Sequence, residues 1–148
     1  NKVADGLDRD LTTTPPDVIG INIGTNDQRN GISSATFTTA LTSLLNAIIA
    51  ATPRTTRIVV FLPFGGHYGA TVYQNAIAAT TKPRRCWFVN TVGWWNTLDA
   101  AAALHPYGFA NQSRLAPLAA AALREALNAG RTFRKVDGEL EAIRASRY

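Results

Sequence analysis

Short apolar runs rich in β-branched residues alternate along the chain with stretches in which apolar residues recur every three or four positions. The short runs, which predict buried strands, cover 17–23, 57–62 and 86–92. The stretches with helical spacing run from Ser33 or Ser34 to just before Pro53, over 70–81, and from Asn111 to about Asn128. Strand and helix thus alternate three times. This order is typical of a parallel sheet covered by helices, and the fold class is α/β.

The two ends of the chain depart from this pattern. Residues 1–16 are polar and end in two prolines, which predicts an opening loop. Residues 131–148 are charged and predict a basic tail or a short helix around Leu140 and Ile143. We therefore expect one domain over 1–130. Parallel sheets of this kind usually have about five strands, so three strands indicate a sheet that is incomplete at its start.

Composition narrows the class of protein further. A chain of 148 residues with 46% hydrophobic and 17% charged residues suits one folded domain. The net charge of +5 raises the question of nucleic-acid binding. However, the densest group of basic residues lies in the tail (Arg131, Arg134, Lys135, Arg144 and Arg147). We expect a solvated basic tail and no nucleic-acid partner.

The cysteine content and the lengths of the apolar segments bear on disulfides, metal sites and membrane spans. Cys86 is the single cysteine, so no intramolecular disulfide forms, and its apolar neighbours predict a buried thiol. We expect no metal and no cofactor. We also expect no segment that spans a membrane.

Three polar clusters follow the three predicted strands. They are Gly24-Thr25-Asn26-Asp27, Gly65-Gly66-His67 and the segment that holds Asp99 and His105. In parallel sheets covered by helices, ligands bind at the carboxyl ends of the strands. These clusters are therefore the candidate site.

Asn26 and His105 have the side chains best suited to chemistry. Asn26 follows a strand and a glycine, where its amide can donate to an oxyanion; the alternative is a strand-ending turn. His105 precedes Pro106, which keeps it in a loop where imidazole can transfer protons. The alternative for His105 is a capping or packing role.

Other residues near these clusters can touch a ligand. His67 lies in a glycine-rich loop and can contact substrate, although we do not expect it to be the main base. Trp94 and Trp95 can stack on a sugar, but we favour for this aromatic pair a role in packing the last strand and loop against a helix.

Two of these segments together resemble a known family. Ile23-Gly24-Thr25-Asn26-Asp27 resembles the Gly-x-Asn-Asp block of SGNH (GDSL-like) serine ester hydrolases. Leu104-His105-Pro106 resembles their last block, whose usual form is Asp-x-x-His-Pro. The order of the blocks and the strand-helix-strand between them also fit. The resemblance covers about residues 15–130.

The resemblance implies a fold and a set of roles. The fold is a flavodoxin-like three-layer sandwich with strand order 2-1-3-4-5, of which this chain would supply strands three to five. Asn26 would donate to the oxyanion and His105 would be the general base. Gly24 and Thr25 would lie beside the substrate together with His67 and Trp94. The substrate would be a carboxylic ester, such as an acetylated carbohydrate or a lipid acyl ester, and the family favours an extracytoplasmic location.

The chain departs from the family pattern in two places. No Gly-Asp-Ser nucleophile block is present, so a companion chain or upstream fragment would carry the serine. Ala102 stands where the family has aspartate, which leaves Asp99, six residues before His105, as the candidate to orient the imidazole. The alternatives are a serine-histidine dyad, or a non-catalytic module that holds a glycan or a protein partner. A nucleotide site is disfavoured, because Gly65-Gly66 lacks the spacing of a phosphate loop.

Overall fold

Three parallel strands form the centre of the molecule. The computed structural model describes residues 11–94, 109–129, 132–136 and 139–143. The strands β1 (Val18–Ile21), β2 (Arg57–Phe61) and β3 (Cys86–Val89) form one sheet in the order β1-β2-β3. Val18 pairs with Arg57, and Ile58 pairs with Cys86. The structure therefore confirms the expected α/β class with a parallel sheet.

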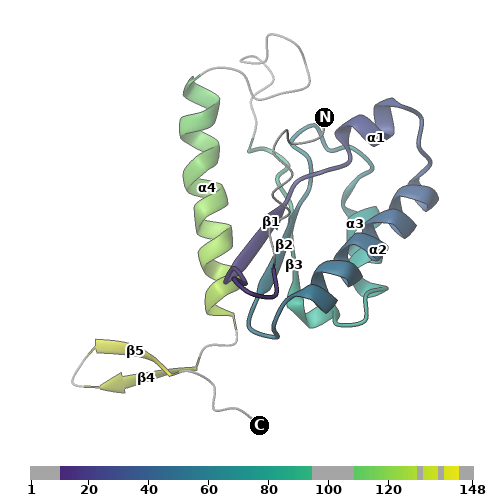
Figure 1. The fold of residues 1–148 in the computed structure, drawn as a ribbon. Helices are drawn as coiled ribbons and strands as arrows, with labels where there is room; N and C mark the ends of the chain where they lie inside the picture. Colours follow the sequence, from purple (N-terminus) through teal and green to yellow (C-terminus); the bar gives the residue numbers. More distant parts are fainter. Residues whose placement is uncertain (1–10, 95–108, 130–131, 137–138, 144–148) are drawn as a thin grey trace.

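Helices lie on both faces of this sheet (Figure 1). The helices α2 (Ser34–Ala51) and α3 (Ala70–Ala78) cover one face, and α4 (Phe109–Asn128) covers the other. The short helix α1 (Thr25–Arg29) follows β1 directly, and a single 3-10 turn, η1 (Pro83–Arg85), precedes β3. The result is three layers, as the alternation of strands and helices predicts.

The first face of the sheet carries the larger part of the core. Helix α2 buries one stripe of residues at helical spacing, namely Phe37, Leu41, Leu45 and Ile49. This stripe packs on Ile58 and Val60 of β2, both fully buried, and on Tyr73 of α3. Ser33 caps the helix by accepting a hydrogen bond from the Thr36 N–H at 3.1 Å, which confirms the expected start.

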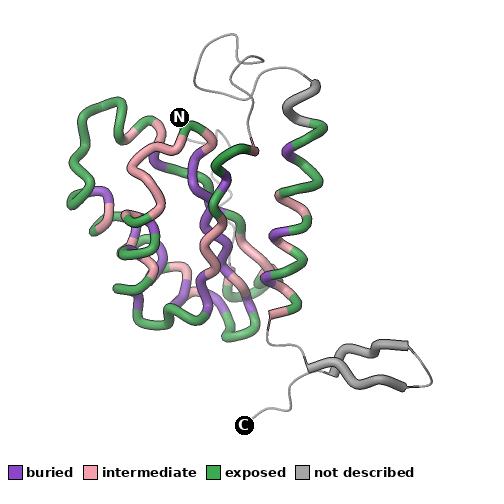
Figure 2. Tube along the Cα trace, turned by 180° about the vertical axis from the view of Figure 1, so that it is seen from behind, coloured by how far each residue is buried: buried purple, intermediate pink, exposed green. Residues whose placement is uncertain are grey.

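The second face is smaller and is covered by α4 alone. Val59 and Phe61 of β2 pack against Ala122 and Ala126 of that helix. Figure 2 shows that buried residues gather along the strands, between the helical layers. The Arg57 guanidinium donates to the Ala129 carbonyl oxygen at 2.8 Å and so ties the end of α4 to the start of β2. Both faces of β2 are thus closed to solvent.

The outer strand β1 has a neighbour on one side only, among the residues that the structure describes. The Arg57 N–H donates to the Asp17 carbonyl at 2.9 Å, and the register continues as a parallel pair. Because alternate residues of a parallel strand bond to the same neighbour, Ile19 and Ile21 bond to β2. The peptide groups of Val18 and Gly20 therefore face the open side.

Three expectations differ from the structure in detail. The strands are shorter than predicted, because the chain turns as soon as pairing with β2 ends. Residues 25–29 form the helix α1 rather than a simple turn. The C-terminal tail holds two antiparallel strands, β4 (Thr132–Val136) and β5 (Glu139–Ile143), where a short helix was the alternative. The sequence between them is Asp-Gly, the pair favoured in two-residue hairpin turns, and this signal outweighs the apolar pair Leu140 and Ile143.

One helix has the length and composition that a membrane span requires. Among the described residues, Ser34–Ala51 of α2 reach a mean hydropathy of 1.4, which meets that requirement by length and composition alone. The helix buries its apolar stripe against the sheet, as a core helix does. The absence of a membrane span stays a prediction.

Candidate functional site

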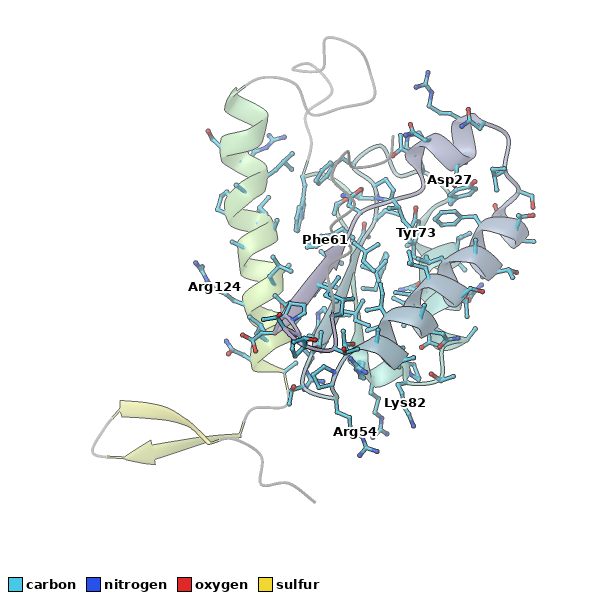
Figure 3. All side chains as sticks on the ribbon, viewed as in Figure 1. Asp27, Arg54, Phe61, Tyr73, Lys82 and Arg124 are labelled. Atoms are coloured by element: carbon cyan, nitrogen blue, oxygen red, sulfur yellow. The ribbon has the colours of Figure 1, made fainter. Side chains whose placement is uncertain are left out.

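The loops that follow β1 and β2 meet at the carboxyl end of the sheet. The first runs from Asn22 into α1, and the second covers residues 62–69. In Figure 3, Asp27 of α1 and Tyr73 lie at this end of the sheet, whereas Arg54 and Lys82 lie at the opposite end. The structure thus brings together two of the three polar clusters that the sequence singles out.

Gly24 turns the chain from β1 into α1. Its φ of +117° lies in the region that favours glycine, and its carbonyl accepts from the Gln28 N–H at 3.1 Å. A Cβ at this position would overlap the hydroxyl oxygen of Tyr73. That hydroxyl donates to the Ile23 carbonyl at 2.8 Å. The buried Tyr73 therefore supports the turn from below, and the turn needs glycine for two separate reasons.

Gln28 joins the two loops. Its side-chain oxygen Oε1 accepts from the backbone N–H of Tyr68 at 3.0 Å and lies 3.0 Å from Nδ1 of His67. The Tyr68 hydroxyl donates to the Ile32 carbonyl at 2.7 Å. Its ring stacks on Phe37 with centroids 4.4 Å apart. These contacts hold the loop after β2 against α1 and the start of α2.

Asn26 lies in the first turn of α1 with an exposed side chain. Its backbone carbonyl accepts from the Asn30 N–H at 3.0 Å, which fixes the helical turn beneath it. Its side-chain amide makes no hydrogen bond with any residue that the structure describes. Thr25 beside it is half-buried. The amide of Asn26 is thus free to donate to a ligand at the carboxyl end of the sheet.

Tyr68 and Tyr73, near Asp27 of α1, both have raised pKa values. Burial raises the pKa of Tyr73 far above its ordinary value, with smaller contributions from Tyr68 and the negative charge of Asp27. Desolvation, followed by Asp27, also raises the pKa of Tyr68. Both phenols therefore stay protonated at neutral and mildly alkaline pH, and both act as hydrogen-bond donors.

Trp94 lies on the other face of the sheet from the Phe37–Tyr68 pair. Its half-buried ring packs edge to face against Phe61 with centroids 6.3 Å apart, within the group of residues covered by α4. The backbone N–H of Trp94 donates to the Thr91 carbonyl at 2.9 Å. The contact with Phe61 supplies the packing role that the sequence left open beside sugar stacking.

Asp99 and His105 lie outside the described residues, as does Trp95. Their approach to Asn26 stays a prediction. The last residue described before them is Trp94, after β3, and the next element is α4.

The described part of the chain contains no group of three or more histidine, cysteine or acidic side chains placed to hold a metal ion. Cys86 is buried, and burial raises the pKa of its thiol against smaller opposing effects of Thr80 and Arg85. It is a neutral core side chain, as its apolar neighbours in the sequence predict.

Sequence reasoning missed Gln28 and Tyr73. Gln28 follows Asn26 by two positions, but an exposed glutamine in a polar stretch carries no signal before the second loop is placed beside it. Tyr73 lies within the helix predicted over 70–81, but nothing in the sequence indicates that its side chain is fully buried and that its hydroxyl reaches Ile23.

No known protein family, curated protein or solved structure matches the chain. The family resemblance therefore stands on the two sequence blocks, of which the structure describes the first.

Proposed function

We propose that the chain is the carboxyl-terminal part of an SGNH-type serine ester hydrolase. Asn26 supplies an oxyanion donor, His105 is the general base, and Asp99 orients its imidazole. The observation that carries the proposal is the exposed Asn26 amide on the first turn after a parallel strand, free of hydrogen bonds to described residues. An oxyanion donor must be held before the reaction, and α1 with Gly24 and Tyr73 does this for Asn26.

The finer fold in this proposal is the flavodoxin-like sandwich. In that fold the third, fourth and fifth strands are neighbours in chain order. The order β1-β2-β3, with helices on both faces, supports this assignment. The first strand of the family sheet would then lie beside β1.

Within the described ranges, one side of β1 has no neighbouring strand, which supports an origin of the nucleophile outside these 148 residues. The peptide groups of Val18 and Gly20 face that side and offer two donors and two acceptors to a further strand. A strand in that position, parallel to β1 as in the family fold, would end at the same end of the sheet as Asn26. A serine directly after it would lie beside the substrate, whether it belongs to a companion chain or to an upstream part of the same polypeptide.

The reaction in this arrangement has two halves. His105 takes the proton of the serine hydroxyl while the serine oxygen attacks the ester carbonyl. The Asn26 amide then donates to the oxyanion. Collapse expels the alcohol, which receives that proton from His105, and leaves an acyl-serine. Water then repeats the sequence, releases the acid and restores the serine.

The test uses the chain together with any co-purifying fragment that carries a Gly-Asp-Ser sequence, identified by intact mass and N-terminal analysis. Hydrolysis of 4-nitrophenyl acetate should fall by roughly 10²–10³ in Asn26→Ala. It should be lost in His105→Ala. The matched control is Asn75→Ala, an exposed asparagine on α3, which should keep full activity. Activity that survives His105→Ala contradicts the proposal.

A non-catalytic binding module is the second candidate. It is favoured by one feature of the sequence: no serine follows an apolar strand in a Gly-Asp context. The same material decides between the two, because glycan binding without turnover supports the module and contradicts the hydrolase.

A further inference from the structure

His67 is the histidine of the loop after β2, and its ring is half-buried. Its Nδ1 lies 3.0 Å from Oε1 of Gln28. The two ring nitrogens of a neutral imidazole differ, since one carries a hydrogen and the other a lone pair. The partner of Nδ1 therefore decides what Nε2 offers to a ligand.

A second donor fixes which atom of the Gln28 amide faces His67. The backbone N–H of Tyr68 donates to the same Oε1 at 3.0 Å. An NH₂ group in this place would set two donors against each other, so the atom between Tyr68 and His67 is the carbonyl oxygen. A carbonyl oxygen only accepts. Nδ1 of neutral His67 must therefore carry the hydrogen.

Nε2 of His67 then keeps its lone pair. It accepts no hydrogen bond from any residue within the described ranges. Nε2 lies beside Gly65, where a Cβ would come within 2.7 Å of it. The absence of a side chain at residue 65 leaves the ring room to hold this orientation. Gln28 thus sets the tautomer of His67, and Gly65 leaves the space that the ring orientation needs.

We propose that Gln28 is a positioning residue that holds His67 with its hydrogen on Nδ1, and that Nε2 accepts a hydrogen bond from a hydroxyl group of the ligand. Gln28 lies two residues after Asn26 on α1, so the acceptor belongs to the same end of the sheet as the oxyanion donor. Such an acceptor selects an ester whose alcohol keeps a free hydroxyl, as a partly acetylated carbohydrate does. This choice of substrate rests on the proposed hydrolase function, whereas the position of the hydrogen does not.

The tautomer is tested on the ¹⁵N-labelled chain at mildly alkaline pH, where imidazole is neutral. Long-range ¹H–¹⁵N spectra separate protonated from unprotonated ring nitrogens, and His67→Gln identifies which of the two histidines gives each signal. His67 should show a protonated Nδ1. Gln28→Leu should move the hydrogen toward Nε2, and Gln28→Glu should restore the original pattern.

The matched control for Gln28→Leu is Gln74→Leu, which changes an exposed glutamine on α3 and should leave the His67 signals unchanged. A wild-type chain in which Nε2 carries the hydrogen overturns the role of Gln28. This measurement needs no serine and no turnover.

The hydroxyl acceptor is tested by binding. The labelled chain is titrated with a methyl glycoside that carries one acetyl group, and in parallel with its fully acetylated form. The first should shift the Nε2 signal of His67, and Gln28→Leu should weaken its binding about fivefold, the effect of one hydrogen bond. An equal response to both sugars, or no response, overturns this part. Selective binding of the first sugar without any hydrolysis would support the role of Nε2 as acceptor and contradict the proposed hydrolase function.

Discussion

At the scale of single residues, the turn at Gly24 after β1 depends on its contact with Tyr73. Gly24 has a positive φ, and the Tyr73 hydroxyl fills the space where its side chain would stand. Tyr73 in turn satisfies the carbonyl of Ile23. The exposed Asn26 therefore depends on a partly buried hydrogen bond between the Tyr73 hydroxyl and the backbone carbonyl of Ile23.

Gly24→Ala should lower the free energy of unfolding by about 2–3 kcal/mol, because backbone strain and a steric overlap act together. Gly31→Ala is the control: its φ is +76°, but no heavy atom lies within 4 Å of the added Cβ. It should cost about 1 kcal/mol. Urea denaturation of both variants measures the difference, and equal losses would contradict the overlap with Tyr73.

Tyr73 should also give the protein an alkaline limit. Burial, then Tyr68 and Asp27, raise its pKa in the folded state, while in the unfolded chain it titrates near the ordinary value of 10.0. Above that pH the unfolded state releases a proton that the folded state keeps, so stability falls with rising pH, by up to about 1.4 kcal/mol per pH unit. Below it, the contribution is fully present.

Thermal unfolding followed from about pH 9 to about pH 11 measures this effect. Tyr73→Phe should have a lower Tm than wild type at the first pH, because it lacks the hydrogen bond to Ile23. Its Tm should then fall less steeply. If Tm fell equally steeply with pH in wild type and in Tyr73→Phe, Tyr73 would have the same pKa in the folded and unfolded states, and the prediction would be wrong.

At the scale of elements, α2 ends on a buried arginine. The Arg85 guanidinium donates to the Ile49 carbonyl at 2.9 Å, and to the carbonyl and hydroxyl of Thr52 at 3.2 and 2.6 Å. The last carbonyls of a helix have no partner within the helix, and Arg85 supplies one. Burial lowers the pKa of Arg85, but arginine stays charged at any ordinary pH.

Arg85→Met should therefore cost about 3 kcal/mol of unfolding free energy, since several buried acceptors lose their donor at once. Arg85→Lys should recover part of this, because an ammonium group reaches fewer acceptors. Its neighbour Arg84 is exposed, and Arg84→Met should change stability by less than about 0.5 kcal/mol. Urea midpoints for the three variants test this ranking of stability losses. An Arg85→Met variant as stable as wild type would refute it.

Helices and strands were largely predictable from the sequence, and their connections were not. The apolar runs located all three strands of the sheet and the helical spacing located α2, α3 and α4, because burial on one face leaves a periodic trace. Asn26 could be singled out because it follows a strand. Gln28 and Arg85 could not, since each acts on segments far away in sequence, and a polar residue looks the same whether solvent or a distant carbonyl is its partner.

At the scale of the whole molecule, the outer edge of β1 decides whether the sheet is complete. Amides of Val18 and Gly20 point to that edge, whereas those of Ile19 and Ile21 bond to β2. Amide hydrogen exchange on the chain alone should be fast at the first pair and slow at the second.

Under the proposed function, addition of the proposed companion segment should slow exchange at Val18 and Gly20 by at least about tenfold and leave Ile19 and Ile21 unchanged. Strong protection of all four amides in the chain alone would mean that the edge is already paired, for example with a second copy. The alternation between neighbouring residues serves as the internal control.

The bond between Arg57 and Ala129 gives α4 a fixed point at one extremity. Its 20 residues extend about 30 Å from there, and a tilt of about 5° at that pivot would carry the opposite extremity through about 2.6 Å. His105 precedes that distant extremity by four positions. A substitution at Arg57 would thus displace the start of α4 at Phe109 without touching it.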